Sequence, residues 1–216
     1  DILINLDSED EGELYIGCAG GINGNFRFTY KEEAVPKNMK AYKIGISGLK
    51  GGHSGLDIAL GRGNSCKIMI RLLHHGIEKH DMLLSSIDAG NMRNAIPREA
   101  NAVVVIPNEE EEKFLSCFKK LTATIKAELS VTEPDLKITA EPTDTPSFVM
   151  DANAQNSMIR ATYGCPNGVI RMSDAMPGLV ETSTNLSIIS SEKGKIKVIC
   201  LLRSSVDSAK FDLVNM

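Results

Sequence analysis

His53 has the clearest candidate chemistry in this sequence, because it lies in a glycine-rich turn. Residues 48–55 read Gly-Leu-Lys-Gly-Gly-His-Ser-Gly, so half of them are glycines. Glycine adopts positive φ readily and allows another molecule to approach the backbone closely. An imidazole on such a turn can donate, accept or titrate near neutral pH. The pattern fits a functional histidine. It also fits a flexible turn with a solvated side chain, because short glycine-rich motifs are weakly specific.

Asp7 is a second candidate, as a ligand of a metal ion or a substrate. Residues 1–6 form an apolar run that predicts a buried strand, and Asp7 follows this run directly. A carboxylate at the carboxyl end of a buried strand often binds a ligand in α/β proteins. The same position also suits an aspartate that only forms a turn.

The other three histidines have a structural interpretation. His74, His75 and His80 lie near the predicted end of a helix, where the helix dipole favours imidazolium charge. Adjacent residues on a helix diverge, so the sequence predicts no metal site from these histidines. The glutamates at 109–112 begin the next helix, where acidic side chains are favourable, and they too are predicted to be solvated.

The elements that position these residues follow a β-α-β-β-α-β order from residue 40 to residue 141. Apolar alternation and helical spacing predict strands at 40–47, 82–89, 100–106 and 136–140, a helix at 62–75 capped by Gly76, and a helix from about residue 108. The two helices are amphipathic and need a sheet to pack against. The sequence therefore predicts an α+β fold, in which an antiparallel sheet carries two or three helices on one face, with a ferredoxin-like core and extra strands.

Further elements flank this core on both sides. Strands at 13–19 and 25–31 are predicted to form a hairpin around the glycine-rich residues 20–24. The remaining chain predicts a helix at 151–163, a loop at 164–176, a hairpin of strands at 181–190 and 195–203, and the start of a helix at 211–216.

The composition narrows the class of protein. An apolar content of 42% is enough for a core, and the net charge of −4 without a basic cluster argues against nucleic-acid binding. No apolar run approaches 18 residues, so no membrane span is predicted. The five cysteines are scattered and form no CxxC motif, which is typical of reduced thiols in a cytoplasmic protein.

Several motifs, in order along the chain, resemble one family of enzymes. The sequence is similar to the aminoacyl-histidine dipeptidases of the M20 metallopeptidase family over nearly its whole length. The motifs that carry the resemblance are ILINLDSEDEGELYIGCAGG (2–21), GLKGGHSGLDI (48–58), GRGN (61–64), RNAIPREA (93–100), PNGVIRMSD (166–174), VETSTN (180–185) and LLRSSVDS (201–208).

The resemblance implies a division of the chain and an activity for a longer protein. In this family an inserted lid, or dimerisation, domain interrupts a catalytic peptidase domain. Residues 1–21 would then be a strip of the catalytic domain, 22–208 the lid domain, and 209–216 the return to the catalytic domain. The parent protein would be a cytoplasmic homodimer that hydrolyses Xaa-His and other dipeptides with water activated by two zinc ions.

The resemblance also implies a role for four residues. Asp7 would be a ligand of one zinc ion, and His53 would stabilise the oxyanion in a catalytic centre across the dimer. Asn94 and Arg203 would hold the C-terminal carboxylate of the substrate. The family's remaining metal ligands and its general-base glutamate have no counterpart in this sequence. The chain alone is therefore expected to be inactive and to bind no zinc tightly.

A non-enzymatic alternative stays open at this stage. An α+β module that only mediates self-association would keep the same core pattern and could keep the motif residues for structural reasons. Flanking sequence with further metal-ligand motifs would favour the enzyme, and flanking sequence without them would favour the module.

Overall fold

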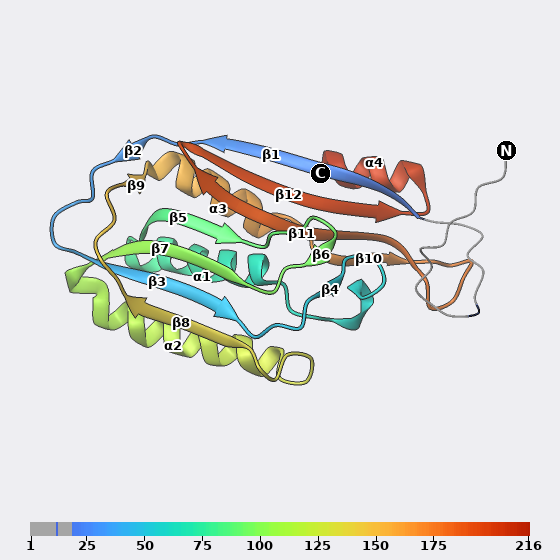
Figure 1. Ribbon diagram of the computed structural model, residues 1–216, viewed down its shortest axis with the longest axis horizontal. Helices are drawn as coiled ribbons and strands as arrows, with labels where there is room; N and C mark the ends of the chain where they lie inside the picture. Colours follow the sequence, from blue (N-terminus) through green and yellow to red (C-terminus); the bar gives the residue numbers. More distant parts are fainter. Residues whose placement is uncertain (1–11, 13–18) are drawn as a thin grey trace.

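The computed structural model describes residue 12 and residues 19–216 (Figure 1). Its strands are β1 (Gly20–Thr29), β2 (Glu32–Glu33), β3 (Met39–Ser47), β4 (Gly52–His53), β5 (Leu83–Ala89), β6 (Ala95–Ile96), β7 (Ala100–Pro107), β8 (Lys137–Pro142), β9 (Val149–Met150), β10 (Gly168–Met172), β11 (Val180–Glu192) and β12 (Lys195–Ser204). Its helices are α1 (Ser65–His80), α2 (Glu111–Glu128), α3 (Ala152–Gly164) and α4 (Asp207–Asn215), with short 3₁₀ helices η1 (Ile58–Leu60) and η2 (Asn108–Glu110).

One eight-stranded antiparallel sheet organises the fold. Its order is β1-β12-β11-β5-β7-β3-β8, and β10 pairs with β11 beside this path. The contiguous strands β5-β7-β3-β8, with α1 after β3 and α2 after β7, form the ferredoxin-like unit. The predicted α+β class, antiparallel sheet and ferredoxin-like core are therefore confirmed.

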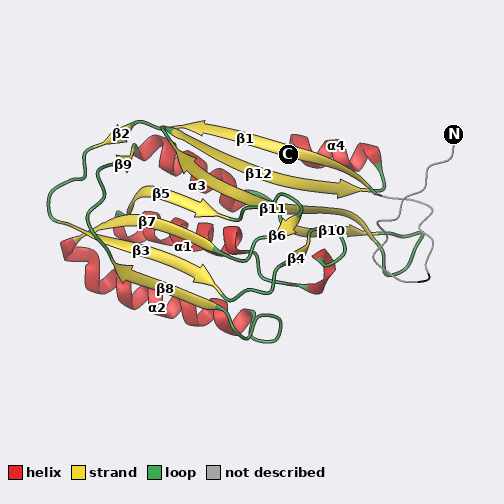
Figure 2. Cartoon of the chain, in the orientation of Figure 1, coloured by secondary structure: helices red, strands yellow, loops and turns green. Residues whose placement is uncertain are grey.

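The helices lie on one face of this sheet, as Figure 2 shows. Fully buried residues of α1 and the sheet, among them Met69, Leu73, Ile44 and Val104, fill the space between the two layers. The described part of the chain has four α-helices rather than two or three. The additional helix is α4, whose buried Leu213 joins the core beside β1 and β12. None of the described helices is long and apolar enough to cross a membrane.

The predicted hairpin at residues 20–24 is wrong. These residues belong to β1, which pairs with β12 without interruption from Gly20 to Thr29. A tight turn would require positive φ, and none of Gly20, Gly21 and Gly24 has it. Pairing along the whole of β12 therefore overrides the local turn preference of the glycines. Most of the first predicted strand, residues 13–18, lies outside the described residues.

The first helix extends beyond its predicted end. Gly76 is buried inside α1, and a Cβ there would overlap the side chain of the buried Met82. The helix needs glycine at this position for packing, not as a cap. It ends instead at Asp81, whose φ of +48° is left-handed. His75 and His80 consequently both lie in the last turns of one continuous helix.

The predicted loop at 164–176 is wrong in part, because it contains strand β10. This strand pairs with β11 through two register irregularities, and three of its five residues are exposed. Its glycine and proline neighbours carry the loop signal, while its pairing depends on β11, which is distant in sequence. The hairpin of β11 and β12 is confirmed.

Candidate functional site

The turn that carries His53 requires its glycines. Gly48 and Gly52 have φ values of +79° and +143°, a region that other residues rarely adopt. A Cβ at Gly52 would also overlap the side chains of Asp57 and Arg62. The glycine content is therefore a steric requirement of a defined turn, which argues against a flexible, solvated loop.

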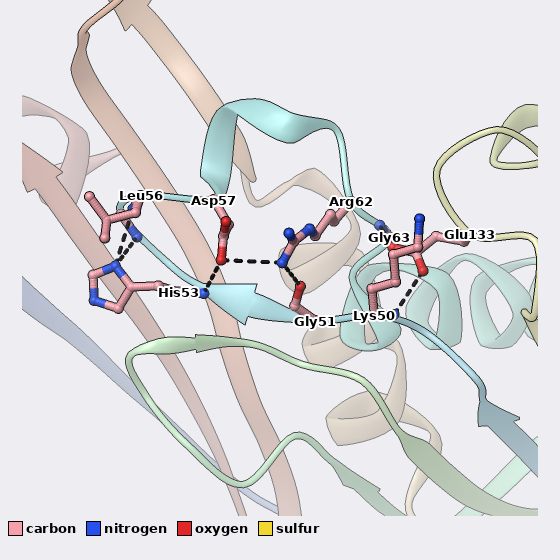
Figure 3. A network of polar contacts seen from close by, with 9 residues as sticks. Lys50, Gly51, His53, Leu56, Asp57, Arg62, Gly63 and Glu133 are labelled. Carbon is pink, nitrogen blue, oxygen red and sulfur yellow. Dashed lines mark hydrogen bonds and ion pairs between the residues drawn. The ribbon is translucent and has the colours of Figure 1, made fainter. Parts of the chain in front are cut away.

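A buried carboxylate holds this turn from one side. Glu133, only 2% exposed, accepts hydrogen bonds of 2.8 Å from the backbone N–H groups of Lys50 and Gly63 (Figure 3). The charge of a carboxylate strengthens such bonds to backbone donors. Glu133 thereby fixes both ends of the segment that contains His53.

A second set of contacts fixes the middle of the segment. The Asp57 carboxylate accepts a 2.8 Å hydrogen bond from the His53 backbone N–H and lies 3.2 Å from Arg62 Nη1. Arg62 also donates to the carbonyl oxygen of Gly51. His53 itself pairs across β4 and β6 with Ala95. The backbone of His53 is thus held from both directions along the chain.

The contacts of the His53 ring determine its tautomer. Its Nδ1 lies 3.3 Å from the backbone N of Gly55 and 3.1 Å from that of Leu56. Backbone N–H groups only donate, so Nδ1 must be the accepting nitrogen. In the neutral ring the proton is therefore on Nε2, which makes Nε2–H a donor pointing away from the turn.

Arg203, on β12, places a second donor beside the Nε2–H group of His53. Its Nη2 lies 3.5 Å from His53 Nε2 and 3.5 Å from Ser54 Oγ, and its Nε is buried without a partner among the described residues. Two N–H donors cannot satisfy each other. The His53 and Arg203 pair, which we call the donor pair, is therefore suited to an anion or a developing oxyanion that would accept from both.

Asn94 lies next to the donor pair along the backbone. Its carbonyl oxygen accepts a 2.9 Å hydrogen bond from Ser54 N–H, and its side chain is exposed. The fold therefore brings together three of the four candidates, His53, Asn94 and Arg203, from segments far apart in sequence. Asp7 lies outside the described residues.

Buried polar residues on β11 hold the loop that contains Asn94. Asn185 donates to the carbonyl of Ala95 at 2.8 Å, and Ser187 donates to that of Arg93 at 2.6 Å; both side chains are fully buried. Asn64, which caps α1, donates to the carbonyl of Leu186 at 2.9 Å. The sequence did not reveal these positioning roles. A buried Asn or Ser has the same local signature as a surface one, although Asn64 and Asn185 lie within GRGN and VETSTN.

The residues around the donor pair do not form a metal site. Backbone N–H groups occupy His53 Nδ1, and the guanidinium beside Nε2 would repel a cation. Among the residues that the structure describes, the His, Cys, Asp and Glu side chains that converge at ligand distances lie elsewhere. No metal-dependent step can therefore be derived from this part of the chain.

Comparison with known proteins relates the chain to one family of peptidases. Residues 37–133 match the model of the M20 peptidase dimerisation domain. This part of the chain is therefore similar to that domain. The whole chain is 38% identical to cytosol non-specific dipeptidase of Escherichia coli (strain K12), of which it covers 44%. Its structure matches aminoacylhistidine dipeptidase from Vibrio alginolyticus with a TM-score of 0.92 and 42% identity, covering 97% of this chain and 43% of that one.

These matches confirm the resemblance to this family that the motifs carry. The matched residues 37–133 include β3 to α2, and with them His53 and Asn94, while Arg203 follows on β12. The chain spans less than half the length of either relative. Both relatives are dipeptidases by name.

Proposed function

We propose that this chain is the lid and dimerisation part of a longer metallodipeptidase and that it supplies substrate-contacting groups to the catalytic centre. The observation that carries the proposal is the donor pair, in which Arg203 Nη2 of β12 lies 3.5 Å from Nε2 of His53 on its rigidly held turn. A dipeptide under hydrolysis offers two matching acceptors, its C-terminal carboxylate and the oxygen of the scissile carbonyl.

The roles of the individual residues follow from their chemistry. His53 donates through Nε2–H to the oxygen that gains charge in the tetrahedral intermediate. The planar guanidinium of Arg203 binds the substrate carboxylate through two parallel hydrogen bonds, and the exposed amide of Asn94 adds a further donor. Both interactions are stronger where the lid excludes water from the substrate.

The metal centre belongs to the remainder of the proposed enzyme. We assign one of its ligands to Asp7 and place the two zinc ions in a catalytic domain, to which residues 1–21 and 209–216 belong. When bound, such ions polarise the scissile carbonyl and activate water. Residues 22–208 form the lid in this division, although its boundaries fall within β1 and α4. The name of the Escherichia coli relative supports a cytosolic location.

We further propose that the lid forms a homodimer, because the matched domain is named for dimerisation. The sheet has β8 at one end, paired only with β3 among the described strands. An open edge of this kind can pair with the same edge of a second copy, which is compatible with two-fold symmetry. Such an arrangement allows His53 of one protomer to serve the catalytic centre of its partner.

Hydrolysis of an Xaa-His dipeptide tests the proposed function. We expect the complete protein, loaded with zinc, to release both amino acids, and the 216-residue chain to show no activity under the same conditions. The chain should nevertheless be dimeric by light scattering. A complete protein that folds, binds zinc and leaves every tested dipeptide intact would contradict the proposal and favour a module that only self-associates.

A further inference from the structure

A group of side chains that could ligate a metal ion lies near the C-terminal end of α1, away from the donor pair. His75, His80 and Cys117 place one ligand atom each within 4.8 Å of one another. His75 and His80 lie in the last turns of α1, whereas Asn64, which belongs to the network around the donor pair, caps its first turn. The mechanism proposed above does not use these three residues.

The contacts of His80 indicate that it is prepared to bind a cation. Its side chain is 5% exposed, and its Nδ1 lies 3.2 Å from Glu110 Oε2. Glu110 also forms an ion pair with Lys113, at 2.6 Å, and as a carboxylate it can only accept hydrogen bonds. The Nδ1 of His80 therefore carries the proton. The lone pair of the neutral ring is on Nε2, which is buried and has no hydrogen-bond partner in the described part of the chain.

The carboxylate of Glu110 therefore holds the far side of the His80 ring, as carboxylates do behind metal-binding histidines. Metal ligands of this type donate their other ring N–H to a carboxylate, which fixes the tautomer and orients the ring. Phe114 packs edge-on against the His80 ring, with ring centroids 5.9 Å apart, and restricts its rotation further. A buried Nε2 lone pair without a donor is costly, and a metal ion would satisfy it.

The other two side chains complete a nitrogen and sulfur donor set. His75 offers a second imidazole nitrogen, within 4.8 Å of the ligand atoms of His80 and Cys117. Imidazole binds a metal in its neutral form. His75 and Cys117 are both half-buried, which leaves an approach for an ion and for a water molecule as fourth ligand. Two imidazoles, one thiolate and one water fit the tetrahedral preference of zinc.

We propose that His75, His80 and Cys117 bind a transition-metal ion, with Zn²⁺ as the ion that this donor set favours. The site joins the end of α1 to α2. The histidines of this region were predicted to act only through the helix dipole. The proposed site would give His75 and His80 a further role beside that one, whereas His74 stacks on Tyr163 with ring centroids 4.2 Å apart.

Titration of the 216-residue chain with Co²⁺ alone and with Zn²⁺ alone tests this site. We expect one ion per chain, a sulfur-to-cobalt charge-transfer band, and a dissociation constant for zinc of roughly 1 μM or lower, because the fold holds three ligand atoms near one another. This result would overturn the expectation from sequence that the chain binds no zinc tightly. Cys117→Ser should abolish the band. His75→Gln and Glu110→Gln should each weaken zinc binding by about 10–100-fold, because the first removes a ligand and the second removes the carboxylate that orients His80.

Two matched variants control for metal binding elsewhere. His74→Gln removes the adjacent histidine, and Cys165→Ser removes a half-buried thiol that lies 3.7 Å from Cys200 Sγ. Both should leave the band and the stoichiometry unchanged, and circular dichroism should confirm the fold of every variant. The proposal would be overturned by a wild-type chain without the band, or by a band that survives Cys117→Ser and disappears in Cys165→Ser. Because the chain has no expected peptidase activity, these results do not depend on the proposed function.

Discussion

Replacing His53 with alanine in the complete protein is expected to lower kcat by about 10²–10³-fold, the usual effect of losing one oxyanion donor. KM should change much less, because the Nε2–H group meets full negative charge only in the transition state. The turn supports this expectation, since the hydrogen bonds that Glu133 and Asp57 accept from its backbone do not involve the His53 ring and remain when the ring is removed. Steady-state kinetics on an Xaa-His dipeptide measure both constants.

The matched control for this variant is His74→Ala. His74 is a histidine of the same chain that stacks on Tyr163, outside the donor pair, so its loss should leave kcat unchanged. Zinc content and circular dichroism must match the wild type in both variants. If His53→Ala retained the wild-type kcat under these conditions, His53 would have a structural role only.

Replacing Arg203 with alanine is expected to act mainly on KM. The substrate carboxylate is charged in the ground state and in the transition state alike, so the role proposed for Arg203 would contribute to both. Loss of a partly buried, bidentate partner should raise KM by roughly 10²-fold or more. Arg203→Lys should give an intermediate value, because lysine keeps the charge and loses the planar fork.

Arg27 provides the control for the effect of charge alone. It is an exposed arginine on β1, paired in register with Lys197 of β12, the strand that carries Arg203. Arg27→Ala should leave KM within about twofold of the wild type, as expected for an exposed side chain. A substrate amide in place of the C-terminal carboxylate should affect the wild type strongly and the Arg203→Ala variant little. Equal losses in both proteins would show that Arg203 does not contact the carboxylate.

The ferredoxin-like core was predictable from sequence because its periodicity is local. The alternation around Ile44 in β3 and the helical spacing around Met69 in α1 each follow from residues a few positions apart. The ends of helices and strands that depend on packing or on strand pairing in the folded protein were not predictable. The helix continues through Gly76 because Met82 packs against it, and residues 20–24 extend as a strand because β12 pairs with them.

The candidate site was predictable only in its motif residues. His53, Asn94 and Arg203 were identified by type and motif, and the fold brings them together. The residues that hold them in position, such as Glu133 and Asn185, were not identified, because their burial depends on tertiary structure. The cluster at the end of α1 was missed for the same reason, since Cys117 comes from another helix and reaches the two histidines only after packing.

Mixing two inactive variants of the complete protein tests the central claim most directly. One protomer carries His53→Ala, the other Asp7→Ala, and the two are unfolded together, refolded and loaded with zinc. Random pairing of equal amounts makes half of the dimers mixed. If His53 acts across the dimer, each mixed dimer contains one catalytic site in which both Asp7 and His53 are intact. The mixture should then recover about a quarter of the wild-type activity, as random pairing in a two-fold dimer requires. A mixture that stays as inactive as its components, although the mixed dimer is isolated and zinc-loaded, would contradict the claim that this lid supplies His53 to its partner.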